Sequence, residues 1–140
     1  MNLGLGLYQQ QHADLLRTAR ALEAVLAGAW VPGSAGLARG HLLHLSGKLT
    51  VHLQMEDSSL YPAFFASAEP GLHSVAAHFK ESMGALKADA DAFFRRWLRP
   101  DAIATDHGEF RAAAHELLGA ITARIAAEEA ELYPLAERAG

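Results

Sequence analysis

The chain contains one segment twice, as HLQMEDSSLYP at residues 52–62 and as RIAAEEAELYP at residues 124–134. The two copies lie 72 residues apart and share a glutamate followed by a Leu-Tyr-Pro ending. Their first positions differ in kind, because His52 in one copy corresponds to Arg124 in the other. Both copies belong to long stretches rich in alanine, leucine, glutamate and arginine, which are strong helix formers. The duplication therefore suggests a repeated pair of helices.

The spacing of apolar residues predicts four helices and no strand. Breaks rich in glycine and proline separate them, at GAWVPGSAG (28–36), SAEPG (67–71) and RPD (99–101). The predicted helices cover about residues 7–28, 37–65, 72–98 and 103–138. Helices joined by such short connections predict an all-α fold, an antiparallel up-down-up-down four-helix bundle. Pro62 and Pro134 fall late in the second and fourth helices, and we expect each to kink or end its helix.

Length and composition narrow the class of protein. A chain of 140 residues that is 51% hydrophobic is expected to form one domain, residues 1–140. A net charge of −4 predicts no binding of nucleic acid or of anionic membranes. The absence of cysteine excludes disulfides, thiolate nucleophiles and iron–sulfur clusters. We find no signal peptide and no apolar span long enough to cross a membrane, and we expect a cytoplasmic protein.

The second predicted helix carries a pair of polar residues on its apolar face. His52 and Glu56 are four residues apart, so their side chains project from one face, which also carries Leu45, Leu49 and Leu60. An imidazole and a carboxylate that point into a bundle core need a partner, because burying them unpaired costs several kcal/mol. A metal ion held between facing helices would satisfy both groups.

The other three predicted helices each add one donor. His12 lies on the apolar face of the first helix, we expect His78 to face inward from the third, and Glu128 lies on the apolar stripe of the fourth. A single inward histidine is more often a hydrogen-bonded core residue than a ligand, but four helices that agree indicate a metal centre. Five further histidines are expected to have surface or structural roles: His41, His44, His73, His107 and His115.

These residues together resemble those of the hemerythrin-like (HHE cation-binding) domains, and the repeated Glu-x-x-x-Leu-Tyr-Pro is the most specific part of the resemblance. The resemblance implies a four-helix bundle around a pair of non-haem iron ions bridged by carboxylates. It also implies a role in oxygen carriage, redox or gas sensing, or iron handling. Carried over to this chain, it implies that the ligands are His12, His52, Glu56, His78 and Glu128.

Arg124 occupies a position where the family carries a histidine ligand, and an arginine does not lose its proton to become an ordinary ligand. Three alternatives follow. Arg124 could pair with Glu128 in place of a metal, which would leave one ion or none. It could instead extend outward, with water or Glu129 completing a two-ion site. As a third alternative, its charge could hold an anionic oxygen adduct or substrate beside a single iron.

The leading hypothesis is a protein that binds non-haem iron in an atypical site with one or two ions. We expect it to act in sensing of O2, NO or redox state, or in metal handling. Another divalent metal would suit the same ligands. The alternative hypothesis is a metal-free helical interaction or signalling module in which Arg124 pairs with Glu128. A third hypothesis, an oxygen-activating di-iron oxidase, ranks last because nothing in the sequence defines a substrate pocket, so we expect binding rather than enzymatic catalysis. The sequence indicates no particular protein partner.

Overall fold

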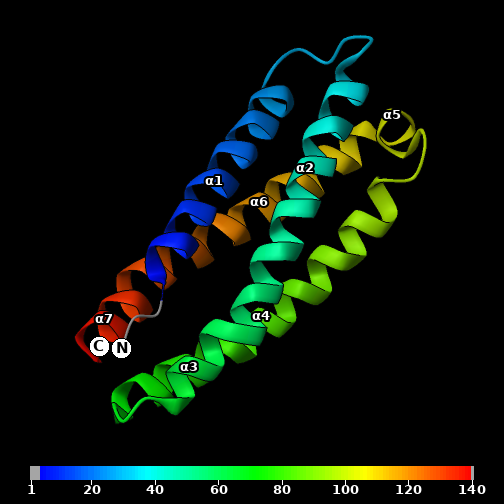
Figure 1. Ribbon diagram of the computed structural model, residues 1–140. Helices are drawn as coiled ribbons and strands as arrows, with labels where there is room; N and C mark the ends of the chain where they lie inside the picture. The colour runs from blue at the N-terminus through cyan, green and yellow to red at the C-terminus, as the bar shows by residue number, and fades with distance from the viewer. Residues whose placement is uncertain (1–3, 140) are drawn as a thin grey trace.

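The computed structural model describes residues 4–139, which are helical along nearly their whole length and contain no strand (Figure 1). This confirms the all-α prediction. The long helices are α1 (Leu5–Ala27), α2 (Ser34–Met55), α4 (Pro70–Trp97) and α6 (His107–Ala127). The short elements are the π-helical turns η1 (Glu56–Leu60) and η2 (Glu128–Leu132) and the helices α3 (Tyr61–Ala66), α5 (Ala102–Thr105) and α7 (Tyr133–Ala139).

The long helices alternate in direction around a shared core (Figure 1). The connection from α1 to α2 and the connection from α4 to α6 lie at one end of the bundle, where the Trp30 and His107 rings stack with centroids 5.1 Å apart. At the same end, Arg111 donates a hydrogen bond of 2.7 Å to the carbonyl of Leu26. The turn from α3 to α4 lies at the opposite end. Four antiparallel helices therefore form the bundle that the helix pattern predicts.

The helix boundaries follow from local residue chemistry. Pro70 opens α4, where its missing N–H is not needed, and the Glu69 carboxylate accepts a hydrogen bond of 3.3 Å from the N–H of Gly71. Gly33 precedes α2 with a φ of 99°, a left-handed conformation that glycine adopts without steric cost. Predicted and observed boundaries agree to within four residues when η1 and α3 are counted with α2, and η2 and α7 with α6.

The two prolines do not end their helices, contrary to one of the expected outcomes. Each is preceded by a π-helical turn, and the chain continues as helix beyond it, to Ala66 after Pro62 and to Ala139 after Pro134. In the first copy, the N–H of Tyr61 bonds to the carbonyl of Glu56, five residues back. A π-helical turn contains one residue more than an α-helical turn. It therefore shifts the backbone N–H to C=O hydrogen bonds by one residue just before the proline, which has no N–H to donate. The repeated segments therefore share a backbone distortion as well as a sequence.

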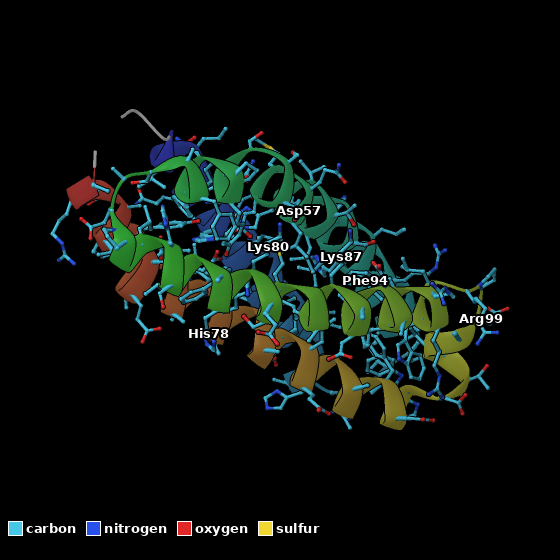
Figure 2. All side chains as sticks on the ribbon, turned by 90° about the horizontal axis from the view of Figure 1, so that it is seen from below. Asp57, His78, Lys80, Lys87, Phe94 and Arg99 are labelled. Carbon is cyan, nitrogen blue, oxygen red and sulfur yellow. The ribbon has the colours of Figure 1, made fainter. Side chains whose placement is uncertain are left out.

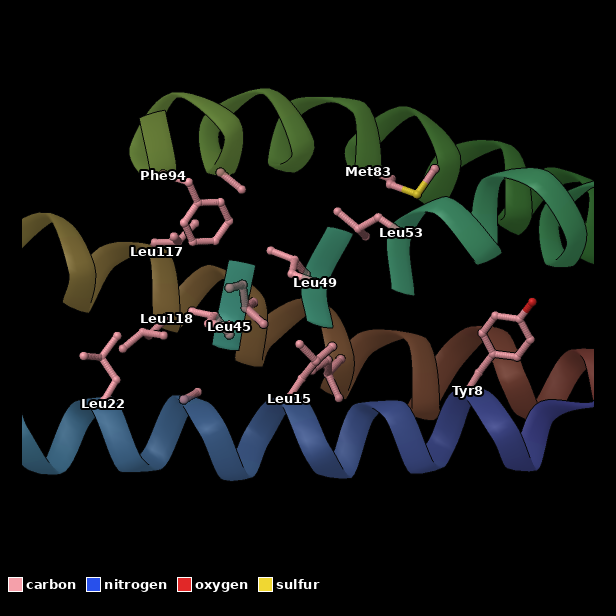
Figure 3. Packing of buried hydrophobic residues seen from close by; sticks show 14 of the residues in the cluster. Tyr8, Leu15, Leu22, Leu45, Leu49, Leu53, Met83, Phe94, Leu117 and Leu118 are labelled. Atoms are coloured by element: carbon pink, nitrogen blue, oxygen red, sulfur yellow. The ribbon is translucent and has the colours of Figure 1, made fainter. Parts of the chain in front are cut away.

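The bundle core is apolar at one end and polar at the other. Figure 3 shows Leu15, Leu22, Leu45, Phe94 and Leu118 interdigitating between the helices of the middle and the apolar end. Each fully buried leucine of this kind stabilises the fold by roughly 1.5–3 kcal/mol. Four buried polar side chains lie instead toward the other end, near η1 and η2: His12, His52, Glu56 and Glu128. Among the described residues, no helix is both long and apolar enough to cross a bilayer.

Candidate metal centre

Four of the five predicted ligands meet in the polar end of the core. His12 comes from α1, His52 from α2, Glu56 from η1 and Glu128 from η2. Their side chains are between 0% and 3% exposed. One ligand atom from each residue can be chosen so that all four atoms lie within 4.8 Å of one another. The helix faces inferred from the residue spacing therefore bring two imidazoles and two carboxylates to one point.

The repeated π-helical turns position the two carboxylates. Glu56 is the first residue of η1 and Glu128 is the first residue of η2, so each carboxylate lies where its helix widens. A π-helical turn inside an α-helix is uncommon and occurs frequently at functional sites. The turns thus relate the Glu-x-x-x-Leu-Tyr-Pro pattern directly to the geometry of the cluster.

His52 is held in one orientation by Gln11. The carbonyl oxygen of the Gln11 side chain accepts a hydrogen bond of 2.7 Å from Nδ1 of His52. Because an amide oxygen only accepts, Nδ1 carries the proton and Nε2 keeps a free lone pair. Nε2 lies 3.2 Å from Oε1 of Glu56, inside the cluster. Gln11 in turn donates to the sulfur of Met55 at 3.2 Å, which fixes its own orientation.

His12 is oriented by groups on both sides of its ring. Its Nε2 lies 3.3 Å from Oε1 of Glu128, whereas its Nδ1 lies 3.6 Å from Oε1 of the partly exposed Glu129. The Tyr133 ring stacks parallel to the imidazole with centroids 5.4 Å apart, and its hydroxyl lies 3.4 Å from Nε2. Nδ1 makes no hydrogen bond, because 3.6 Å is too long for one, so the stacked Tyr133 ring and Glu128 are what orient the imidazole.

The cluster contains polar atoms that nothing in the protein satisfies. Nε2 of His52 and both carboxylate oxygens of Glu56 are buried without a hydrogen-bond partner. Native proteins pair nearly all buried polar atoms, because each unpaired one costs about 1–3 kcal/mol. A divalent cation coordinated by these atoms would remove that cost. The donor set of imidazole nitrogen and carboxylate oxygen fits iron, manganese or zinc.

Burial sets the protonation of the cluster. Desolvation, together with the neighbouring Glu128, raises the pKa of Glu56 to about 10. Burial also acts to raise the pKa of Glu128, but contacts with His12 and Glu56 and the charge of Arg124 outweigh it and hold that pKa well below its usual range. Desolvation and the nearby His12 lower the pKa of His52 to about 4, which keeps its imidazole neutral at pH 7. In the metal-free protein, the two carboxyl groups therefore hold one proton between them.

The fifth predicted ligand does not join the cluster. His78 is exposed, and its ring lies on the outer border of α4 beside α6 (Figure 2). The expectation that it faces inward is wrong, because the buried stripe of α4 runs through Ala76, Phe79 and Met83 instead. His78 is next to Phe79 in sequence and is therefore rotated by about 100° from it. Within Pro70–Trp97, all of which the structure describes, no buried residue can ligate a metal through nitrogen or oxygen of its side chain.

Arg124 points into the protein rather than out to solvent. Its side chain is 10% exposed, and Nη2 lies 3.7 Å from Oε2 of Glu128. The guanidinium also donates to the hydroxyl of Tyr61 at 2.9 Å, to the carbonyl of Phe79 at 3.2 Å and to the hydroxyl of Ser82 at 3.1 Å. This geometry matches the first of the three alternatives, in which Arg124 pairs with Glu128. It excludes the second, in which Arg124 extends outward into solvent.

Tyr61 is a functional residue that the sequence interpretation missed. Its side chain is fully buried, and its hydroxyl donates to Oε2 of Glu128 at 3.2 Å while it accepts from Arg124. From the sequence alone, Leu-Tyr-Pro is interpreted as a helix end whose tyrosine packs over the rim of the bundle, and this interpretation is wrong for Tyr61. The repetition of that tripeptide was the available signal. Gln11 and Tyr133 were also missed, and for Gln11 no pattern in the sequence points to its contact with His52.

The remaining histidines lie away from the cluster, as expected. His115 is 80% exposed beside Glu23, His107 stacks on Trp30, and His73 contacts the backbone carbonyl of Ser67. His41 and His44 belong to the part of α2 that lies two or more turns before His52.

A comparison with protein families agrees with the fold and with the ligand cluster. No curated protein and no solved structure gave a significant match to this sequence. The profile described as the Hemerythrin HHE cation binding domain matches residues 3–136, nearly the whole chain. The protein belongs to the hemerythrin HHE cation-binding family.

Proposed function

We propose that the protein binds one non-haem metal ion, with iron as the physiological metal, through His12, His52, Glu56 and Glu128. The observation that carries this proposal is the buried cluster of four ligand atoms within 4.8 Å, in which His52 Nε2 and both oxygens of Glu56 lack any other partner. Such unpaired atoms are costly in a protein that never holds a cation. Membership of a cation-binding family supports the same conclusion.

The proposal of one ion, rather than two, rests on Arg124 and α4. A second ion beside Glu128 would need further donors from α4 and α6. The facing residues are Phe79 and Met83, which are buried and apolar, and Arg124, whose cation already lies 3.7 Å from Oε2 of Glu128. A fixed positive charge at that distance repels a second cation. Arg124 therefore acts as the permanent substitute for the second ion.

Charge balance supports reversible binding of a divalent cation. In the metal-free state, the proton on Glu56 and the charge of Arg124 leave the cluster close to neutral. To hold a divalent cation, Glu56 would have to give up that proton and act as a carboxylate ligand. Iron held by two histidines and two carboxylates would supply one-electron redox chemistry and would be able to bind O2 or NO. A role in sensing those molecules or redox state, or in handling the metal itself, follows from this proposal.

Metal stoichiometry tests the proposal directly. Protein reconstituted with Fe(II) under anaerobic conditions and then desalted should retain about one iron per chain by elemental analysis. Glu56→Gln and His52→Ala should each lose most of that iron. His78→Ala is the matched control and should retain it, because His78 lies outside the cluster. Protein that is metal-free after desalting, or that retains two ions per chain, would refute the proposal of a single-ion site.

A second candidate function is a metal-free interaction module. The specific observation in its favour is the Arg124–Glu128 pair, because it neutralises a buried carboxylate without any metal. On this alternative, chelators leave the thermal stability of the purified protein unchanged. Against this alternative, His12, His52 and Glu56 are buried beside Glu128 although the Arg124–Glu128 pair does not need them.

A further inference from the structure

The charge of Arg124 acts on the whole ligand cluster and not on Glu128 alone. Desolvation is the largest influence on the pKa of His52, Glu56 and Glu128, and the charge of Arg124 lowers the pKa of all three. The arginine side chain is only 10% exposed, so water screens this charge weakly. A cation held by the cluster therefore lies in the field of a second, fixed positive charge.

The two oxygens of Glu128 face different partners. Oε1 lies 3.3 Å from Nε2 of His12, whereas Oε2 lies 3.7 Å from Nη2 of Arg124 and accepts a hydrogen bond of 3.2 Å from the Tyr61 hydroxyl. The same hydroxyl accepts from Arg124 at 2.9 Å, which directs its own proton toward Glu128. A charge and a hydrogen bond at Oε2 withdraw electron density from the carboxylate. They make Oε1 a weaker donor to a highly charged cation.

Formal charges show what Arg124 does to an ion in the cluster. Both histidines are neutral when they act as ligands, and the carboxylates of Glu56 and Glu128 contribute two negative charges. With Arg124, the total is −1, so a divalent ion brings it to +1 and a trivalent ion to +2. Glu129 is 40% exposed, so solvent screens its charge. Uncompensated buried charge is costly, and the trivalent ion leaves more of it.

We propose that Arg124 makes the cluster select divalent over trivalent cations, so that iron is held as Fe(II). This inference rests on the proposed single-ion site and specifies the charge of its ion. Coulomb repulsion is proportional to that charge, so a repulsion that weakens divalent binding about 30-fold weakens trivalent binding about 160-fold. The resulting preference is about fivefold. Iron kept as Fe(II) suits sensing of O2 or NO, which react with the ferrous ion, better than storage of oxidised metal.

Two ions that do not change their oxidation state test this selectivity without iron. Zn(II) represents the divalent ion and Ga(III) the trivalent ion, and competition with a chelator measures the affinity for each. Arg124→Met and Arg124→Gln should each increase the affinity for Ga(III) at least fivefold more than the affinity for Zn(II). Glutamine keeps an amide that can donate hydrogen bonds, so the two variants differ in their contacts and share the lost charge. Circular dichroism checks that both are folded.

Two further variants separate charge from structure. Arg124→Lys keeps a positive charge and should preserve the wild-type ratio of the two affinities to within about twofold. Lys80→Met is the control, because Lys80 is 49% exposed beside Asp57 and solvent screens its charge. Equal changes in the Zn(II) and Ga(III) affinities of the neutral variants would overturn the inference and leave the single-ion site intact. A wild-type protein that binds neither ion would refute the single-ion site, and the inference with it.

The midpoint potential of the iron-loaded protein gives an independent measurement. Arg124→Gln should lower the potential of the Fe(III)/Fe(II) couple, because the ferric ion gains more than the ferrous ion when the charge is lost. A fivefold change in the ratio of the two affinities corresponds to about 40 mV, since a tenfold change is about 59 mV for one electron. Arg124→Lys should shift the potential by less than half as much. A potential that is unchanged or higher in Arg124→Gln with one iron per chain would overturn the inference.

Discussion

Replacing Arg124 by methionine tests the central feature of the candidate site, because methionine keeps the apolar stem and removes the charge. In the metal-free protein the guanidinium pairs with Glu128 and donates to Tyr61, Phe79 and Ser82. Removing one partner of a buried ion pair typically costs about 3–5 kcal/mol. Glu128 keeps its contacts with His12 and Tyr61, so we expect a somewhat smaller loss of about 2–4 kcal/mol.

The same substitution should strengthen metal binding. A metal ion beside Glu128 replaces the lost positive charge, so the loaded variant should be destabilised much less than the metal-free variant. If the ion recovers about 2 kcal/mol of the loss, thermodynamic linkage requires an affinity that is roughly 30-fold tighter. Metal binding to Arg124→Met would then be stronger than to the wild-type protein, although the variant is less stable without metal.

Urea unfolding of wild-type and variant protein, each with and without metal, measures both effects. Arg17→Met is the control, because Arg17 is 72% exposed and its ion pair with Asp14 lies at the surface. An exposed pair of this kind contributes about 0–1 kcal/mol, so the control should change neither the stability nor the metal affinity appreciably. Arg124→Met would refute the reasoning if it lowered the stability of loaded and metal-free protein equally, or left the metal-free protein unchanged.

Three further predictions follow from individual contacts. Gln11→Leu should weaken metal binding about 10–100-fold, measured by competition with a chelator, because His52 loses its orienting partner, whereas Gln10→Leu at the neighbouring exposed position should not. Burial raises the pKa of Glu56 in the folded protein above its ordinary value in the unfolded chain. The folded protein therefore binds this proton more tightly, and the stability gained in this way is lost as pH rises from the ordinary pKa toward the raised one. The lowered pKa of His52 acts in the opposite direction between about pH 4 and its ordinary pKa, so the two effects offset each other there. The unfolding free energy of the metal-free protein should therefore decline above about pH 7, toward about pH 9, and Glu56→Gln should remove that decline; parallel curves would contradict this. Phe110→Ala should cost about 3–5 kcal/mol in chemical unfolding yet leave metal stoichiometry unchanged, because Phe110 is fully buried at the apolar end of the bundle, and a loss of metal would contradict that separation.

The bundle and most of the cluster could be predicted because both follow from periodicity along one helix. The relation between His52 and Glu56 is local, since residues four apart on a helix always share a face. The apolar stripes that carry His12 and Glu128 are equally local. Once four amphipathic helices enclose one core, residues on those stripes have to meet near its axis. The structure brings all four together within 4.8 Å.

The position of His78 could not be predicted in the same way, because α4 offers two faces of similar character. Val75 and Leu86 suggest a stripe that includes His78, whereas Ala76, Phe79 and Met83 suggest another. In the structure the second stripe is buried, and Val75 and Leu86 lie half-buried at its border. The choice depends on how α4 packs against α2 and α6, and that packing is not encoded in the spacing within α4.

The sequence by itself determined the helical repeat, the bundle and the four side chains that face its polar end, because each depends on residues within one or two helical turns. Only the tertiary structure decided what Arg124 does, since its partners Tyr61, Phe79 and Ser82 belong to other helices, up to 63 residues away along the chain. A long flexible side chain at the border of a helix face can turn outward or inward. The acceptors on neighbouring helices turn it inward here, because they accept hydrogen bonds from Nη1 and Nη2 that solvent would otherwise accept.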